Sequence, residues 1–173
     1  FQAYTSFPWE TVYKNVEHGL KIQGMDVEER SKITHRFLKL VHLQDFADAY
    51  PAELSGGMQK RVALARAIAD KPEILLFDEP TSGLDPITGG VIDRLIIDAV
   101  QRLGATTVTI SHDMASVRRI AEKVAMVHNG VILWCGDVKD MDKSGVPEVH
   151  QFVHGLAEGP LTQTTAPTQQ SRK

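Results

Sequence analysis

The chain has 173 residues, of which 42% are hydrophobic and 24% charged, values that are ordinary for a globular domain. The formal net charge of −3 gives no bulk attraction to nucleic acid or to an anionic membrane, so no nucleic-acid partner is expected. The longest apolar runs, ILLF and VILWC, are far shorter than the roughly 18 residues that a membrane helix needs. A single cysteine, Cys135, excludes an internal disulfide framework and suits a reducing compartment.

The first half of the chain predicts helices. It opens with FQAYTSFPWE, which has neither an initiator methionine nor a signal-peptide pattern, so we expect the chain to start in mid-protein. Residues 26–43 place Ile33, Phe37, Leu40 and Val41 at the spacing of a core-facing helix. A second helix is expected from Ser55 to about residue 70.

The second half alternates strand and helix signals. EILLFD (73–78) predicts a strand of a parallel sheet buried on both faces, and ATTVTIS (105–111) predicts the next buried strand. Between them, Pro86 starts a helix that Gly104 ends, and a further helix is expected over residues 113–121. The alternation describes an α/β domain, part of whose sheet lies upstream.

A hairpin and a helix are predicted toward the C-terminus. Asn129-Gly130 lies between two apolar runs, and this pair suits a type I′ turn because both residues tolerate positive φ. The last helix falls within residues 146–157, starting at about Pro147. Residues 158–173 contain few apolar side chains, so a disordered tail is expected there.

The stretch LSGGMQKR suits an anion at the start of a helix. Ser55 can cap the helix, while Gly56 and Gly57 let backbone N–H groups approach a ligand closely. The usual phosphate-binding loop, G-x-x-x-x-G-K-[ST], does not occur in the 173 residues. The question is therefore which phosphate this stretch would hold, since the chain has no such loop to bind one.

Two carboxylates and a histidine follow the predicted strands. Asp78 could hold Mg²⁺ beside a nucleotide, and Glu79 could polarise a water for attack on the γ-phosphate. His112 follows the neighbouring strand, so its imidazole is expected near Glu79, where it could donate to the γ-phosphate. Alone, each group also suits a cap, a solvated turn or an exposed histidine, but their joint order and spacing favour function.

These stretches resemble a known family. LSGGMQKR, ILLFDEPTSGLDP and TISHD resemble the signature motif, the Walker B motif with D-loop, and the switch histidine of ATP-binding-cassette (ABC) ATPases. FQ followed by SFPWETVYKNV resembles the Q-loop and the surface beyond it, so the resemblance covers roughly residues 1–136. It implies a P-loop NTPase-like core, a parallel sheet flanked by helices, with a helical subdomain at about 7–70 and core strands and a C-terminal β-hairpin at 71–136.

The resemblance also implies which part of an ABC ATPase domain this chain corresponds to. In this family the Walker A loop and the aromatic residue that stacks on adenine lie upstream. Residues 1–157 are therefore expected to be the C-terminal two-thirds of one ABC ATPase domain. Without Walker A, the chain as given is expected neither to bind ATP tightly nor to hydrolyse it.

The family pattern assigns roles to eight residues of this sequence that match it. It assigns the metal and attacking water to Gln2, Mg²⁺ to Asp78, the catalytic base to Glu79, the γ-phosphate to His112 and dimer communication to Asp85. The signature, with Ser55, Gly56 and Gly57, holds the γ-phosphate of ATP bound to the other subunit. The cofactors implied are ATP and Mg²⁺.

The resemblance implies an ATPase subunit that powers an ABC transporter as a dimer, with ATP between Walker A of one subunit and the signature of the other. A homodimer docked on an integral-membrane permease, at the cytoplasmic face of the inner membrane, is expected. Residues 7–44 correspond to the region that receives the permease, where Phe7, Pro8 and Trp9 are expected to be half exposed.

Two features resemble the ATPases of Mla-type phospholipid-trafficking systems in double-membraned bacteria: Met58 in the signature and the ending PEVHQFVHGLAEGP. They imply a periplasmic lipid-binding partner and a small regulatory subunit. An importer of amino acids or other polar solutes stays open as an alternative, as does a non-transport ABC ATPase. A catalytically inactive subunit is disfavoured because Glu79 and His112 are present.

Other polar residues are expected to be structural. His150 and His154 lie four apart, but HQFVH lacks the glutamate of H-E-x-x-H and no third ligand is evident, so no zinc site is expected. Arg118 and Arg119 are expected on a solvated helix face, and Cys135 in a partly buried strand.

Overall fold

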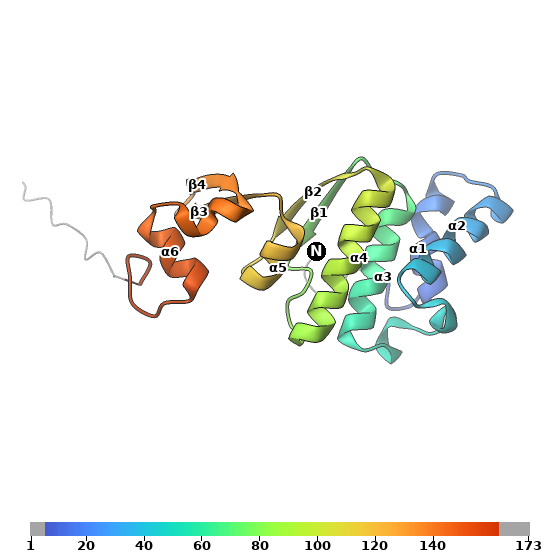
Figure 1. Ribbon diagram of the computed structural model, residues 1–173. Helices are drawn as coiled ribbons and strands as arrows, with labels where there is room; N and C mark the ends of the chain where they lie inside the picture. The colour runs from blue at the N-terminus through green and yellow to red at the C-terminus, as the bar shows by residue number, and fades with distance from the viewer. Residues whose placement is uncertain (1–5, 163–173) are drawn as a thin grey trace, which may run out of the picture. The chain divides into compact units, whose positions relative to one another are not determined.

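The computed structural model describes residues 6–162 of the chain (Figure 1). It consists of two compact units, residues 1–120 and residues 121–173, which are described separately. Within the described range, every helix is too short or too polar to cross a lipid bilayer.

Three helices form the first part of the first unit: α1 (Val12–Ile22), α2 (Val27–Leu40) and α3 (Gly56–Ala69). Short 3₁₀ turns, η1 (Gln44–Phe46) and η2 (Pro51–Glu53), connect α2 to α3. The sequence analysis assigned no separate helix to residues 12–22. This helix is capped by Thr11 and buries its Val12, Val16 and Leu20 face against α2 and α3.

Helix α2 ends three residues earlier than predicted, and α3 follows its prediction closely. Asp26 caps α2, its side chain accepting a hydrogen bond from the Glu28 amide. Ser55 caps α3 as predicted. Residue 41 ends α2 because the chain turns there, and His42 takes the left-handed conformation with φ 55°.

Two parallel strands follow, β1 (Ile74–Asp78) and β2 (Thr106–Ile110), paired in register from Ile74 opposite Thr106 to Asp78 opposite Ile110. The crossover between them contains α4 (Pro86–Leu103), which packs on α3, and the short α5 (Met114–Ile120) follows β2 and packs on α4. As predicted, α4 starts at Pro86 and ends at Gly104, whose φ of 64° favours glycine.

The expectation that these strands are buried is wrong for one face of the described sheet. Leu75 is buried, 4% exposed, and belongs to the helical core, whereas Ile74 and Leu76 are 62% and 63% exposed. On β2, Val108 and Ile110 are likewise 56% and 63% exposed. The reason is geometric: side chains alternate between the two faces of a strand, and the helices of the described unit cover one face.

The second unit contains a hairpin of β3 (Lys123–His128) and β4 (Val131–Asp137), followed by η3 (Val138–Lys143) and α6 (Pro147–His154). The turn has positive φ at both Asn129 and Gly130, as predicted. Helix α6 ends earlier than predicted because Gly155 adopts the left-handed conformation. Cys135 is exposed rather than partly buried.

The buried Gln151 closes the end of the second unit. Its Nε2 donates to the Leu156 carbonyl and to Thr162 Oγ1, at 3.1 and 3.3 Å, and its Oε1 accepts from the Leu161 amide at 2.7 Å. A Cβ at Gly159 would meet this amide at 2.4 Å, so the backbone can approach Gln151 because residue 159 is glycine. Residues 158–162 of the expected tail form this closing turn, and 163–173 lie outside the described residues.

Candidate nucleotide site

The carboxyl ends of β1 and β2 bring Glu79 and His112 into direct contact, 33 residues apart in sequence. His112 donates to Glu79 Oε1 twice, from ring Nδ1 at 2.7 Å and from its backbone amide at 3.1 Å. The Glu79 amide donates to the Ile110 carbonyl at 2.9 Å, which prolongs the strand pairing by one residue. The predicted proximity of these two side chains is therefore observed.

The environment of Glu79 is unusual in two respects. Its backbone has a φ of 49°, in the left-handed region that non-glycine residues seldom adopt. Its second carboxylate oxygen, Oε2, is buried and has no hydrogen-bond partner. A buried carboxylate oxygen without a partner carries a desolvation cost, which a ligand or a water could relieve.

The pKa of His112 is raised, first by its hydrogen bond to Glu79, then by the charge of that carboxylate and of Asp113. The imidazole itself is largely exposed, whereas Glu79 is mostly covered. The contact therefore favours the protonated imidazole, a form that donates hydrogen bonds from both ring nitrogens.

Asp78 lies at the last position of β1 and lines a groove of about 850 Å³ in the first unit. Gly56 and Lys60 of α3 line the same groove. The described residues contain no cluster of three or more potential metal ligands. One carboxylate nevertheless suits Mg²⁺, because this ion usually binds through one or two carboxylates together with substrate phosphates and water.

The signature residues start α3 as the sequence predicted. Ser55 is exposed, and its Oγ accepts a long hydrogen bond of 3.4 Å from the Met58 amide. Gly57 is buried, and a Cβ there would lie 2.6 Å from Thr88 Cγ2. Glycine at position 57 is therefore also required for packing of α3 on α4.

Asp85 caps α4, its Oδ1 accepting from the Ile87 and Thr88 amides, both at 3.0 Å. Hydrogen bonds from Thr88 are the main reason that the pKa of Asp85 is lowered, and the residue is exposed. Gln2, the remaining predicted residue, lies outside the described residues.

Lys60 contributes a contact that the sequence analysis did not anticipate. Its Nζ, on α3, donates to the Glu79 carbonyl at 3.3 Å. The contact joins the signature helix to the residue expected to act as base. No sequence signal identified it, since a lysine on a helix has no required partner.

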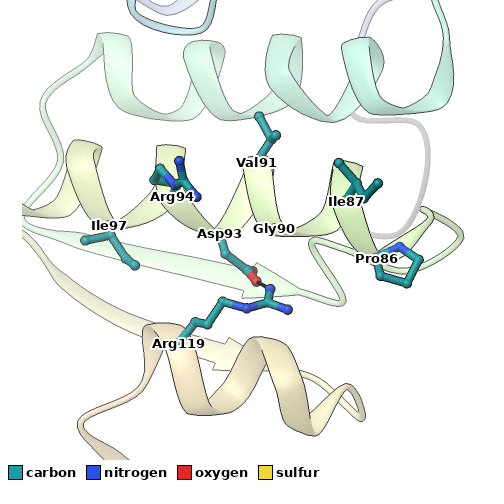
Figure 2. Close-up of a pocket in the computed structure, with 8 residues that line it drawn as sticks. All are labelled: Pro86, Ile87, Gly90, Val91, Asp93, Arg94, Ile97 and Arg119. Carbon is teal, nitrogen blue, oxygen red and sulfur yellow. Dashed lines mark hydrogen bonds and ion pairs between the residues drawn. The ribbon is translucent and has the colours of Figure 1, made fainter.

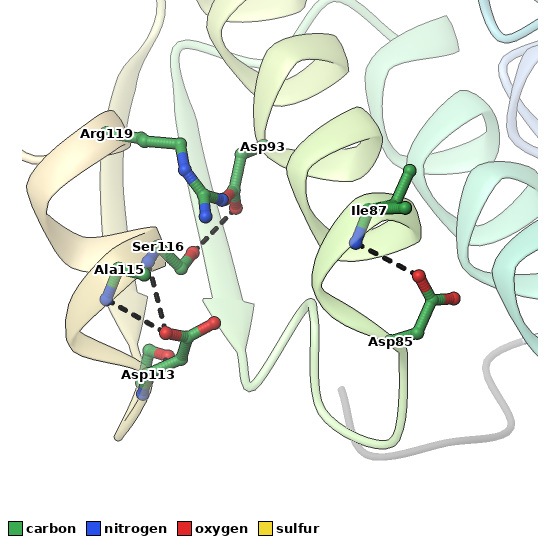
Figure 3. A network of polar contacts seen from close by, with 8 residues as sticks. Asp85, Ile87, Asp93, Asp113, Ala115, Ser116 and Arg119 are labelled. Carbon is green, nitrogen blue, oxygen red and sulfur yellow. Dashed lines mark hydrogen bonds and ion pairs between the residues drawn. The ribbon is translucent and has the colours of Figure 1, made fainter.

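Arg118 and Arg119 are exposed, as expected, but Arg119 also has a partner that was not predicted. Figure 2 shows Arg119 of α5 facing Asp93 of α4 across a surface pocket. Arg119 donates to Asp93 Oδ2, and Ser116 Oγ donates to Asp93 Oδ1 at 2.6 Å (Figure 3). Asp93 and Ser116 are completely buried. Helical spacing gave no signal for this contact, because the two helices meet only after folding.

The fold is that of an ATP-binding cassette. The chain aligns with the dimeric structure of a post-hydrolysis state of the ATP-binding cassette MJ0796 bound to ADP and Pi, with a TM-score of 0.71 and 36% identity. The alignment covers 80% of this chain and 61% of that one. The family described as ABC transporter matches residues 1–82. These matches make the chain similar to part of an ABC transporter ATPase domain.

Two curated relatives are similar over most of the chain. The methionine import ATP-binding protein MetN of Lactobacillus delbrueckii subsp. bulgaricus is 45% identical over 156 residues, covering 90% of this chain and 44% of that protein. The glycine betaine/carnitine transport ATP-binding protein GbuA of Listeria monocytogenes serotype 1/2a is 41% identical over 141 residues. The match covers 82% of this chain and 36% of that protein. The chain thus spans less than half the length of either relative.

Proposed function

We propose that the full-length protein is the ATP-hydrolysing subunit of an ABC transporter. The observation that carries the proposal is the pair of Glu79 and His112, placed at the carboxyl ends of neighbouring parallel strands in a cassette fold. Ligands of α/β proteins bind at this edge of the sheet.

Each residue of the pair has a role in hydrolysis. Glu79 Oε2, buried and without a partner, accepts the proton of the attacking water, while Oε1 stays bonded to His112. His112, once it turns from Glu79, donates to the γ-phosphate. Asp78 would hold Mg²⁺, which neutralises phosphate charge when bound, and Gln2 is proposed to contact that ion and the water.

The protein is proposed to work as a homodimer in which Ser55, Gly56 and Gly57 complete the ATP site of the other subunit, with Asp85 at the dimer contact. The exposed Ser55 hydroxyl and the start of α3 support this role. We place the dimer on a permease at the cytoplasmic face of the inner membrane. Trp9, which is 71% exposed and has its ring centroid 5.7 Å from that of Phe7, supports a docking surface at the start of the first unit.

The comparisons favour a polar solute as the transported substrate. MetN is named for methionine import and GbuA for glycine betaine and carnitine transport, so they support the importer alternative better than phospholipid trafficking. A non-transport ABC ATPase is disfavoured by the same two names. Phospholipid trafficking stays a second candidate on the strength of the ending QFVHGLAEGP, and with it the lipid-binding partner and the small regulatory subunit.

The first test is Glu79→Gln in the full-length protein. Gln keeps the hydrogen bond from His112 but cannot accept a proton, so turnover should fall at least about 100-fold while ATP affinity is kept. Nucleotide should then hold the dimer closed, as measured by light scattering. Turnover within about threefold of the wild-type rate would contradict the assignment.

The matched control is Ser55→Arg in the Glu79→Gln background. Arginine at this exposed helix start places a bulky cation where the partner's γ-phosphate would bind, so ATP should no longer produce a dimer although each monomer still binds it. A normal ATP-dependent dimer would show that the signature does not act on the other subunit.

The transported substrate is tested with the full-length protein and its permease in proteoliposomes. Stimulation of ATPase activity by methionine or glycine betaine, together with uptake of that solute, supports the importer. Transfer of a fluorescent phospholipid without any response to these solutes would support the second candidate instead.

A further inference from the structure

Asp93 is a buried carboxylate that the proposed chemistry does not use. It lies on α4, and its side chain is almost fully enclosed. Both of its oxygens bind groups of α5: Oδ1 accepts from Ser116 Oγ and Oδ2 from Arg119. Figure 3 shows the three side chains bridging the two helices. A buried carboxylate is costly unless it is paired and hydrogen-bonded, so this arrangement ties the position of α5 to α4.

Helix α5 depends on this attachment. It has seven residues, fewer than an isolated helix needs to be stable, and its principal packing partner is α4. Its first turn is bonded to Asp113, whose Oδ1 accepts from the Ala115 and Ser116 amides at 2.9 and 3.3 Å. Ser116 therefore joins two contacts, one through its amide to Asp113 and one through its hydroxyl to Asp93.

His112 directly precedes this turn. Its backbone amide and its ring both point at Glu79, so its position depends on where the chain between β2 and α5 is held. The helix that carries Asp93, α4, starts at Asp85, which caps it. Asp93 lies about 12 Å further along the helix axis, at 1.5 Å per residue. A rigid helix thus links the proposed dimer contact to the attachment of α5.

We propose that Asp93 is a positioning residue that holds His112 in place through Ser116 and Arg119 of α5, and that α4 thereby couples Asp85 to His112. Asp93 acts through the helix that follows His112 rather than on the nucleotide itself. The inference rests on the proposed ATPase function and concerns how that site is aligned.

The test is steady-state ATPase kinetics of full-length Asp93→Asn and Ser116→Ala. Asn keeps an acceptor for Ser116 but turns an amide toward Arg119, and Ser116→Ala removes one donor with little change in volume. Both should lower kcat about tenfold, because a catalytic group displaced by a fraction of an ångström reacts more slowly. ATP affinity, measured by calorimetry, should change less than about twofold.

Three comparisons distinguish a positioning role of Asp93 from a general loss of stability in its variants. Ile96→Val, a buried change on α4 that leaves the hydrogen bonds of Asp93 intact, should lower the unfolding temperature without lowering kcat. Arg119→Lys should retain more activity than Arg119→Ala because it keeps the charge beside Asp93. In a His112→Ala background, Asp93→Asn should lower the residual kcat less than about twofold, since the residue through which it acts is gone.

The proposal is overturned if Asp93→Asn and Ser116→Ala keep kcat within about twofold of wild type, or if Asp93→Asn lowers kcat equally with and without His112. Should Asp93→Asn fail to fold, Ser116→Ala in the same two backgrounds decides the matter. If the wild-type protein hydrolyses no ATP, the proposed function fails rather than this inference.

Discussion

At the scale of single residues, Glu79 combines a strained backbone with an incompletely paired side chain. Its positive φ turns the carboxylate toward the neighbouring strand, where His112 donates to one oxygen. The other oxygen stays buried without a partner. Such strain persists where the surroundings hold it, here through the Glu79 amide bonded to Ile110 and the Glu79 carbonyl bonded to Lys60.

The contact with Glu79 makes a testable prediction for His112. In the nucleotide-free full-length protein, an NMR titration should give a His112 pKa above the ordinary value of about 6.5. Because the folded pKa is raised, the stabilisation from this pair is fully present below about pH 6.5 and is lost as the pH rises through the raised pKa. In Glu79→Gln the pKa of His112 should fall back toward the ordinary value, because the hydrogen bond to a charged carboxylate is gone. A wild-type pKa at or below 6.5 would contradict the observed contact.

At the scale of elements, capping explains where most helices begin and end. Thr11, Asp26, Ser55 and Asp85 each accept a backbone N–H at the start of a helix, and Gly104 and Gly155 end helices in the left-handed conformation. The last helix also needs Gln151, whose amide binds the chain that returns past Gly159. Gln151, Gly155 and Gly159 of the ending QFVHGLAEGP thus have local structural roles.

This role predicts that Gln151→Ala loosens the end of the second unit. The Leu161 amide would lose its acceptor in a partly buried setting, which costs on the order of 1 kcal/mol. Hydrogen exchange at Leu161 should quicken and the unfolding temperature should fall. The control is His150→Gln, an exposed neighbour on α6, which should change stability by less than about 0.5 kcal/mol. Unchanged exchange at Leu161 in Gln151→Ala would contradict the closing role of the amide.

For the molecule as a whole, the sheet of β1 and β2 has one uncovered face. Ile74, Leu76, Val108 and Ile110 are exposed on it, although parallel sheets normally have both faces covered. The chain also lacks the G-x-x-x-x-G-K-[ST] sequence that supplies most phosphate contacts in related folds. The described residues therefore leave this face without apolar cover, and the sequence contains no phosphate-binding loop of this kind.

The 173-residue chain should consequently show no measurable heat when titrated with Mg-ATP. Ser55 and Gly57 offer donors only to a nucleotide held elsewhere, and Asp78 with Glu79 would repel a triphosphate unless a metal ion bridged them. The matched control is the full-length protein under the same conditions, which should bind. Micromolar affinity of the short chain, about −8 kcal/mol, would mean that another segment replaces the missing loop.

Most of the helices and strands could be predicted from the sequence. Capping residues, Gly104, the Asn129-Gly130 pair and the apolar runs act through neighbours a few residues away, so their effect can be predicted without the fold. The proximity of Glu79 and His112 was predictable as well, because each follows one of two neighbouring parallel strands. Helix α1 was not predicted, although Thr11 caps it and its apolar Val12, Val16 and Leu20 recur every four residues.

Tertiary structure alone decided the contacts between elements that lie far apart in the sequence. That Arg119 pairs with a buried Asp93, that Lys60 reaches the Glu79 carbonyl, and that Gly57 must make room for Thr88 depend on how α3, α4 and α5 pack. The exposed face of β1 and β2 depends in the same way on which helices are present to cover it. Residue type and local spacing carry no record of such partners, because side chains from separate helices meet only when the core assembles.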